Sequence, residues 1–172
     1  MKRGGNTESL KRLLDHIRQM VPGITIRTSM IVGYPGETEE EFSQLCRFVG
    51  EVEFDHLGTF TYSDEEGTAS CALEDKLEEE VINHRRDALM KLQAGISKRK
   101  NRQLVGRTLP LLVEGESAET EWLWQGRLES QAPRIAGVVY INDAEGAWPQ
   151  PGDFRSVEIT RALDYDLLGR LV

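Results

Sequence analysis

The sequence predicts an α/β region over residues 1–100, followed by a small five-stranded β-barrel over residues 101–172. Through the first region, apolar residues recur alternately at helical and at strand spacing, in the order helix, strand, helix, strand, helix. This alternation is typical of a parallel α/β sheet. After Lys98-Arg99-Lys100 the pattern changes to five short β-like runs separated by polar turns. Such a run of short strands is typical of a closed, OB-like barrel.

The first predicted element is a helix that polar residues at positions 6–9 can cap and that Pro22-Gly23 ends. Its apolar residues at helical spacing are Leu10, Leu13, Leu14, Ile17 and Val21. A strand is predicted next, over residues 24–32, because apolar and polar residues alternate there.

The stretch over residues 28–42 joins that strand to a helix through the turn Gly33-Tyr34-Pro35-Gly36. Thr38 and Glu41 have the spacing of a capping box, so the helix is expected to begin at Thr38. In α/β folds, ligands bind at the carboxyl ends of strands, where this turn lies. Taken alone, however, a short glycine turn is better explained as a simple connection.

A second strand is predicted over residues 56–62, a polar loop over 63–68 and a long helix over about 77–101. Two strands can neither close a barrel nor complete a parallel sheet. We therefore expect the chain to be the C-terminal part of a larger α/β domain. A bare strand edge favours association, so a dimer through the truncated sheet edge is a further expectation.

The five β-like runs cover residues 104–113, 121–128, 137–142, 154–159 and 165–172. Trp122 and Trp124 alternate with Leu123, so both indoles are expected on one face of a strand. Packing in the barrel core is favoured for this pair over an exposed recognition platform.

The net charge is −8, and residues 1–100 and 101–172 each contribute −4. Composition therefore gives neither half the basic character of a nucleic-acid-binding surface, and a basic partner protein is easier to accommodate. No apolar run reaches the length of a membrane span, and Met1-Lys2-Arg3 does not lead into a signal region. A cytoplasmic location without membrane attachment is expected.

The sequence shows no catalytic set by spacing alone. His16, His56 and His84 are scattered, and Cys46 and Cys71 lack the close spacing of metal or redox motifs. From the residues themselves, the chain is a ligand-binding α/β fragment with a β-barrel, and no reaction is indicated.

Several motifs, however, resemble those of the radical S-adenosylmethionine (SAM) methylthiotransferases, and the resemblance covers nearly the whole chain. The matching stretches are Met1-Lys2-Arg3-Gly4-Gly5-Asn6, Arg27-Thr28, Ile31-Val32-Gly33-Tyr34-Pro35-Gly36-Glu37-Thr38, Phe60-Thr61-Tyr62-Ser63-Asp64-Glu65-Glu66-Gly67-Thr68, Arg85, Leu89-Met90, Gln93 and Asp164-Tyr165-Asp166-Leu167-Leu168-Gly169. The acidic residues after Tyr62-Ser63 resemble those found at this position in the branch that modifies small-subunit ribosomal protein twelve. The tRNA-modifying branch usually carries a basic residue there.

The resemblance implies that residues 1–100 end a radical SAM partial (β/α) barrel and that residues 101–172 form a TRAM β-barrel. It implies a reaction that installs a methylthio group on the β-carbon of an aspartate in ribosomal protein twelve. The implied cofactors are SAM and [4Fe-4S] clusters, and the implied partner is that protein or the ribosome, with tRNA less favoured. A tRNA methylthiotransferase and a non-catalytic TRAM binding module are the alternatives.

The resemblance also implies a cofactor site at the two strand ends. Its cofactor-binding residues would be Arg27, Val32, Gly33, Phe60, Tyr62 and Ser63, with Arg27 or Arg3 meeting the cofactor carboxylate. The cysteine motif that binds the radical-generating cluster in the family is absent from these 172 residues. The cluster ligands are therefore expected outside this chain, and the fragment alone is expected to be inactive.

Overall fold

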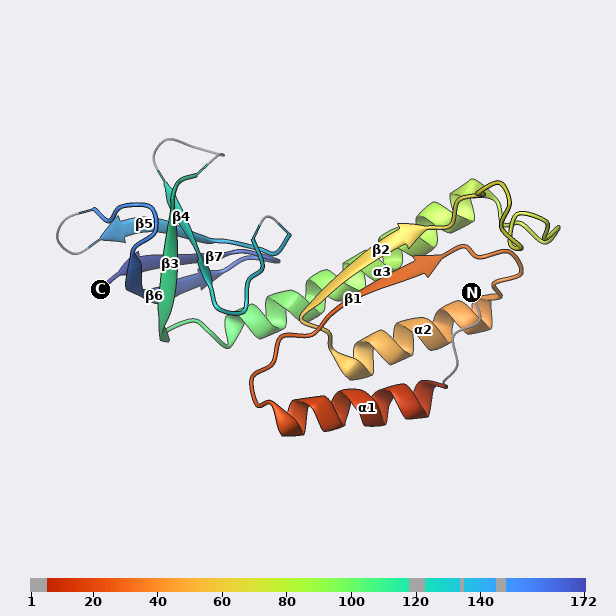
Figure 1. The fold of residues 1–172 in the computed structure, drawn as a ribbon, viewed down its shortest axis with the longest axis horizontal. Coiled ribbons are helices and arrows are strands. Elements are labelled where there is room, and N and C mark those ends of the chain that lie inside the picture. The colour runs from red at the N-terminus through yellow and green to blue at the C-terminus, as the bar shows by residue number, and fades with distance from the viewer. Residues whose placement is uncertain (1–5, 118–122, 134, 145–147) are drawn as a thin grey trace. The chain divides into compact units, whose positions relative to one another are not determined.

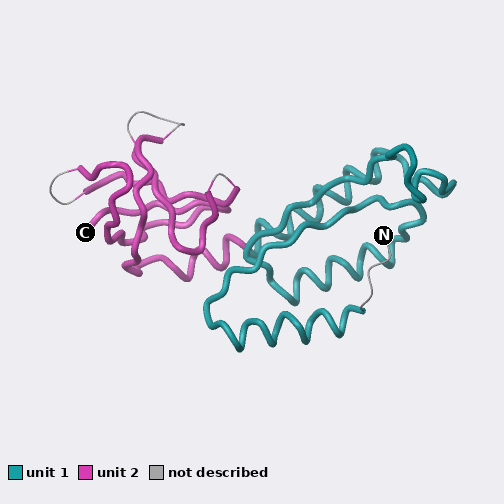
Figure 2. The backbone as a smooth tube through the Cα atoms, in the orientation of Figure 1, with its two compact units in different colours: residues 1–96 teal, residues 97–172 magenta. Residues whose placement is uncertain are grey.

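The computed structural model describes residues 6–117, 123–133, 135–144 and 148–172. The chain divides into two compact units, Met1–Ile96 and Ser97–Val172 (Figure 2). The division falls inside helix α3 (Glu79–Arg102), and the boundary predicted after residue 100 lies in the same helix. No helix in the described part of the chain combines the length and the apolar character needed to cross a membrane.

The first unit has the predicted order of helices and strands. Its elements are α1 (Thr7–Met20), β1 (Arg27–Val32), α2 (Glu39–Val52), β2 (His56–Thr61) and α3, which continues into the second unit. Both predicted helix starts are capped. The Asn6 side chain accepts a hydrogen bond from the Ser9 N–H at 2.8 Å, and Thr38 forms the predicted capping box with Glu41.

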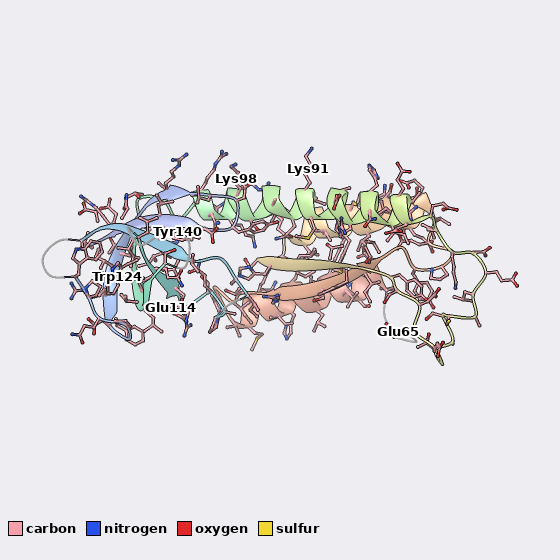
Figure 3. All side chains as sticks on the ribbon, turned by 90° about the horizontal axis from the view of Figure 1, so that it is seen from above. Glu65, Lys91, Lys98, Glu114, Trp124 and Tyr140 are labelled. Atoms are coloured by element: carbon pink, nitrogen blue, oxygen red, sulfur yellow. The ribbon has the colours of Figure 1, made fainter. Side chains whose placement is uncertain are left out.

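Strands β1 and β2 pair in parallel, with Arg27 opposite His56 and Ile31 opposite Phe60. One face of this two-stranded sheet is covered, and α3 forms a layer over it (Figures 1 and 3). The core of the unit lies under this layer. Its buried members are Val32, Phe42, Val49, Val52, Phe54, Leu57, Leu89 and Ile96. Helices α2 and α3 therefore bury their apolar faces against a single side of the sheet.

The connection between α2 and β2 is anchored by polar side chains. Arg18 of α1 donates to the Val52 carbonyl oxygen at 2.7 Å, at the C-terminal end of α2. Gln93 of α3 is fully buried and donates to the Phe54 carbonyl oxygen at 3.0 Å. The bond from Arg18 satisfies a carbonyl group that the end of α2 leaves without an intrahelical partner, and the bond from Gln93 holds the segment that leads into β2.

The second unit holds the predicted five-stranded barrel. Its strands are β3 (Thr108–Glu116), β4 (Trp124–Leu128), β5 (Val139–Ala144), β6 (Phe154–Ala162) and β7 (Leu167–Leu171). They close in the order β3-β4-β5-β7-β6, in which only β5 and β7 pair in parallel. The first strand begins at Thr108 rather than at residue 104, because the chain leaves α3 through a series of turns. The predicted OB-like barrel is confirmed.

Alternate residues of all five strands fill the barrel. The buried core consists of Leu111, Val113, Leu128, Val139, Ile141, Val157, Ile159, Leu167 and Leu171. Trp124 packs against this core and lies 5.9 Å, between ring centroids, from Trp148. Trp122, the other indole of the predicted pair, lies outside the described residues.

Candidate functional site: an open sheet face and the turn beside it

The sheet of the first unit has a second face that its own helices leave open. Along β1, Thr28, Met30 and Val32 are turned toward the core, and the residues between them are exposed. Because side chains alternate along a strand, Ile31 and its register partner Phe60 share this open face. Ile31 is 47% exposed and Phe60 59% exposed. The two side chains form an apolar patch near the carboxyl ends of both strands.

The turn after β1 is tightly packed against α3. Gly33 has a φ of +80°, in the left-handed region that favours glycine. A Cβ at this position would lie 2.6 Å from Cγ1 of Ile82. Gly33 therefore has two separate reasons to be glycine, its backbone conformation and its close contact with α3. Gly36 shares the φ of +80°, but a Cβ there would meet no atom within 4 Å.

A buried ion pair holds this turn in place. Arg85 of α3 donates to Oε1 of Glu37 at 2.6 Å and to the Glu37 carbonyl oxygen at 2.9 Å. Its guanidinium also contacts Glu39 at 3.1 Å and lies 5.3 Å from the centre of the Phe42 ring. The Glu37 carboxylate accepts in turn from the Gly33 N–H at 3.3 Å. The ion pair thus links α3 to the first residue after β1.

Burial makes this pair unusual. The side chains of Arg85 and Glu37 are only 6% and 13% exposed. Removing either partner of such a pair is destabilising, because it leaves the other as a buried, uncompensated charge. Sequence reasoning did not assign a role to either residue. Their positions, an arginine within a helix and a glutamate after Pro-Gly, resemble ordinary surface sites and gave no signal of the contact.

The second strand end carries an aromatic pair. Tyr34 and Tyr62 meet edge to face, with 5.5 Å between ring centroids. The Tyr62 hydroxyl donates to Asp64 at 2.9 Å, and the Lys76 ammonium pairs with the same carboxylate. The hydrogen bond from Lys76, and then that from Tyr62, lower the pKa of Asp64 below its ordinary value. The loop after β2, which includes Glu65 in Figure 3, is therefore fixed where it leaves the strand.

The predicted site residues occupy different environments. Gly33, Phe60, Tyr62 and Ser63 lie at the carboxyl ends of the strands. Val32 is fully buried in the core, so only its backbone reaches the edge of the site. Arg27 begins β1, and its four-residue separation from Ile31 corresponds to about 13 Å along a strand. Arg3 lies outside the described residues.

The described residues contain no group of three or more histidine, cysteine, aspartate or glutamate side chains arranged to hold a metal ion. Cys46 packs against the core of the first unit, and burial raises the pKa of its thiol. Cys71 lies in the loop after β2. We assign no iron–sulfur cluster to these residues.

Comparison with known proteins separates the two units. Residues 105–172 match the TRAM domain family, and this range contains all five strands of the closed barrel. The second unit is therefore similar to the TRAM domain family. The barrel predicted from turn spacing and strand-like runs therefore coincides in location with the family match.

The TRAM domain does not account for the first unit, but longer relatives match both. The chain is 48% identical, over all 172 residues, to the ribosomal protein uS12 methylthiotransferase RimO of Solibacter usitatus. It is 49% identical to the RimO of Koribacter versatilis over 173 aligned positions and 51% identical to that of Myxococcus xanthus over 172. These alignments cover 100% of this chain but only 37%, 34% and 36% of the three relatives. The resemblance to the methylthiotransferases is confirmed, and the chain spans about a third of their length.

Proposed function

We propose that this chain is the C-terminal part of a RimO-type methylthiotransferase and that its first unit ends the radical SAM barrel. The observation that carries the proposal is the open sheet face of β1 and β2. Its apolar patch, Ile31 and Phe60, is exposed at the strand ends, while the opposite face packs against the core of the unit. A one-sided parallel sheet of this kind suits a barrel wall, with helices outside and a ligand inside.

The residues of this face fit the adenosyl part of SAM. A flat purine can lie on the apolar patch, and the strand end at Gly33 brings the backbone close to it. Tyr62 and Ser63 would border the same site, while Val32 would contribute backbone atoms only. Among the predicted contacts, Arg27 is the least favoured, because it lies at the start of β1, at the opposite end of the strand from Gly33. When bound, SAM and a reduced [4Fe-4S] cluster supply a radical that removes hydrogen from an unactivated carbon.

The role of this chain in that chemistry is to bind, to orient and to exclude water. The ion pair between Arg85 and Glu37 holds the turn that begins at Gly33, and Ile82 packs directly against it. A rigid support of this kind positions a cofactor within the narrow limits that catalysis requires. We therefore propose that Arg85 is a positioning residue, which acts through Glu37 on the strand end.

The substrate proposed for the whole enzyme is an aspartate of uS12, modified on its β-carbon in the cytoplasm. The charge of −4 over residues 101–172 favours a basic protein partner over tRNA. We also propose that a second copy can pair with the open edge of the two-stranded sheet. Sedimentation at increasing protein concentration tests this dimer, and a constant monomer mass would contradict it.

These 172 residues alone are proposed to be inactive. They contain two cysteines, whereas cysteine thiolates hold iron–sulfur clusters in sets of four or, with a SAM ligand, of three. The cluster ligands would be supplied by the remaining part of a full-length protein. Cluster absorbance and reductive SAM cleavage by the purified 172-residue chain would contradict this proposal.

A hybrid enzyme tests the function directly. In the hybrid, this chain replaces the matching third of Myxococcus xanthus RimO, with which it is 51% identical. We expect the hybrid to add a methylthio group to uS12, detected by mass spectrometry of the isolated ribosomal protein.

Two other outcomes would decide for the alternatives. Methylthiolation of tRNA in place of uS12 by the hybrid would assign the chain to the tRNA-modifying branch. A hybrid that folds, carries its clusters and binds uS12, but modifies neither substrate, would favour a non-catalytic binding module.

A further inference from the structure

Gly58 lies in the middle of β2, on the open face of the sheet. It is the register partner of Ser29 in β1, and it precedes Phe60 by two residues. Because side chains two residues apart along a strand point to the same side, any side chain at position 58 would lie between Ser29 and Phe60. The lack of a side chain at Gly58 therefore leaves space on the open face, next to the apolar patch.

The fold of the unit does not require glycine at this position. Gly58 has no positive φ, unlike Gly33 and Gly36. A Cβ at position 58 would have its nearest neighbours at 3.7 Å and 4.0 Å, which are ordinary contact distances. At Gly126 in the barrel, by contrast, a Cβ would meet the Leu112 carbonyl oxygen at 2.6 Å. An alanine would therefore fit at position 58 without strain.

Glycine also weakens a strand. It loses more backbone freedom on folding than other residues do, and it contributes no side chain to the packing of the sheet. A strand glycine that neither conformation nor packing requires often marks a place where another group comes close to the backbone. At Gly58, the group that comes close is the ring of Phe60.

The ring of Phe60 leans back along β2 over Gly58. Cε2 of Phe60 is the nearest atom to the Cβ position of Gly58, at 3.7 Å. Residues two apart along a strand are separated by about 7 Å, so a ring that stood upright on the sheet would lie farther away. Phe60 is nevertheless 59% exposed, so the side of the ring that faces away from β2 is accessible.

We propose that Gly58 is a positioning residue of the SAM site, which acts by allowing the Phe60 ring to lie against β2. The inference rests on the proposed function, in which the adenosyl group lies on Ile31 and Phe60. A longer side chain at position 58 would fill the space that the ring now occupies. The ring would then turn outward, into the space that the purine needs.

A purely structural role for this contact leads to a different expectation. An aromatic ring that covers a strand glycine can stabilise the sheet by shielding the backbone. If that were its whole role, a substitution at Gly58 would change stability and leave the affinity for SAM unchanged. The two roles are therefore separated by measuring stability and SAM binding on the same variants.

The test makes the same leucine substitution at Gly58 and at Gly50, a glycine of α2 whose Cβ position has no neighbouring atom within 4 Å. Calorimetry gives the SAM affinity of the Gly58→Ala, Gly58→Leu and Gly50→Leu variants of the hybrid enzyme, with its clusters intact. Urea unfolding of the 172-residue chain, followed by circular dichroism, verifies that each variant folds. Ser29→Leu crowds the same ring from β1 and replaces Gly58→Leu if that variant does not fold.

The position of the ring is measured without any cofactor. In the 172-residue chain, the ring current of Phe60 should shift the Hα NMR signals of Gly58 upfield. Phe60→Ala should remove this shift, and Phe154→Ala, on the barrel, should leave it unchanged.

We expect Gly58→Ala to raise the urea midpoint and to keep the SAM affinity within about twofold, because a methyl group fits beside the ring. Gly58→Leu should weaken SAM binding by about tenfold, and Gly50→Leu should leave it unchanged. Equal SAM affinities of the two leucine variants, or Gly58 Hα signals that do not respond to Phe60→Ala, would overturn this inference alone. An unchanged hybrid that fails to bind SAM would overturn the proposed function together with it.

Discussion

The two units differ in how completely the edges and faces of their β-sheets are paired and packed. In the barrel, every strand pairs on both sides and the inward faces form a closed core. In the first unit, two strands are packed on one face only, and Ile31 and Phe60 remain exposed on the other. The barrel is thus closed, whereas the α/β unit keeps an open face. This difference is the observation from which we propose a ligand site on the open face.

The largest effect is expected at the buried ion pair that supports the open face. Arg85→Met would leave the buried Glu37 carboxylate without its partner, and we expect a loss of about 3–5 kcal/mol in stability. Because both cysteines lie in the first unit, the rate of Cys46 labelling in a Cys71→Ser background reports its opening.

The neighbouring Arg86 provides a matched control. It pairs with Asp87 and its side chain is 40% exposed, so Arg86→Met should cost less than about 1 kcal/mol. Similar costs for the two substitutions would show that the Arg85 pair is not a buried anchor of the turn.

The same isoleucine-to-alanine substitution, made once in each unit, compares the packing of the barrel core with that of the open face. Ile141 is fully buried in the barrel core, and Ile141→Ala should cost about 2–5 kcal/mol. Ile31→Ala should cost less than about 1 kcal/mol, since that side chain is already 47% exposed. All three tryptophans lie between residues 122 and 148, so tryptophan fluorescence during urea unfolding follows the barrel, while Cys46 labelling follows the first unit. A large cost at Ile31 would mean that the open face is packed.

Alanine substitutions at Gly33 and Gly36 separate the effect of backbone strain from that of packing in the turn. Gly36→Ala should cost about 1–2 kcal/mol, because alanine resists the left-handed conformation. Gly33→Ala carries the same strain and also places its Cβ against Ile82, which should add about 1–3 kcal/mol. The additional Ile82→Ala change should recover part of that excess at Gly33 and none at Gly36. The rate of Cys46 labelling measures the stability of the first unit in all of these variants. Equal costs at the two glycines would contradict the close contact with α3.

The smallest effect concerns pH. Since Lys76 and Tyr62 lower the pKa of Asp64 in the folded chain, its contribution to stability is present above the pKa of the unfolded state. It should be lost as the pH falls through the lowered folded pKa. The protection factors for hydrogen exchange of the loop over residues 62–76, which correct for the slower intrinsic exchange in acid, should therefore decrease as the pH falls. Lys76→Gln should move the NMR titration of Asp64 upward. An unchanged titration in that variant would show that Lys76 does not hold the carboxylate.

The sequence was sufficient for elements whose cause is local. Helix starts at Asn6 and Thr38 follow from capping chemistry, and the five strands follow from alternation and turn residues. The open face was only partly predicted. The cofactor site expected at the strand ends included Phe60, which lies on the open face, and Val32, whose side chain packs in the core, whereas the exposed neighbour of Val32 is Ile31. Both residues are apolar, so hydrophobicity alone does not say which of two neighbours faces the helices.

Long-range polar contacts could not be predicted. Arg85 and Glu37 are 48 residues apart, and only the packing of α3 against the turn brings them together. Arg102 and Arg161 likewise line one pocket of the second unit only because the barrel returns to the end of α3. Net charge averages over the whole chain, so the acidic composition concealed this local basic pocket.

The central claim, that the open sheet face binds the adenosyl group of SAM, is tested most directly by two exposed phenylalanines. Phe60 lies on that face, and Phe154, 78% exposed, lies on the barrel. SAM binding by the hybrid enzyme, with its clusters intact, is measured by calorimetry for each alanine variant. The account predicts that Phe60→Ala weakens SAM binding by about tenfold, the effect of losing one stacked ring, and that Phe154→Ala leaves it unchanged. Equal SAM affinity in the Phe60→Ala variant and the unchanged hybrid would contradict the claim.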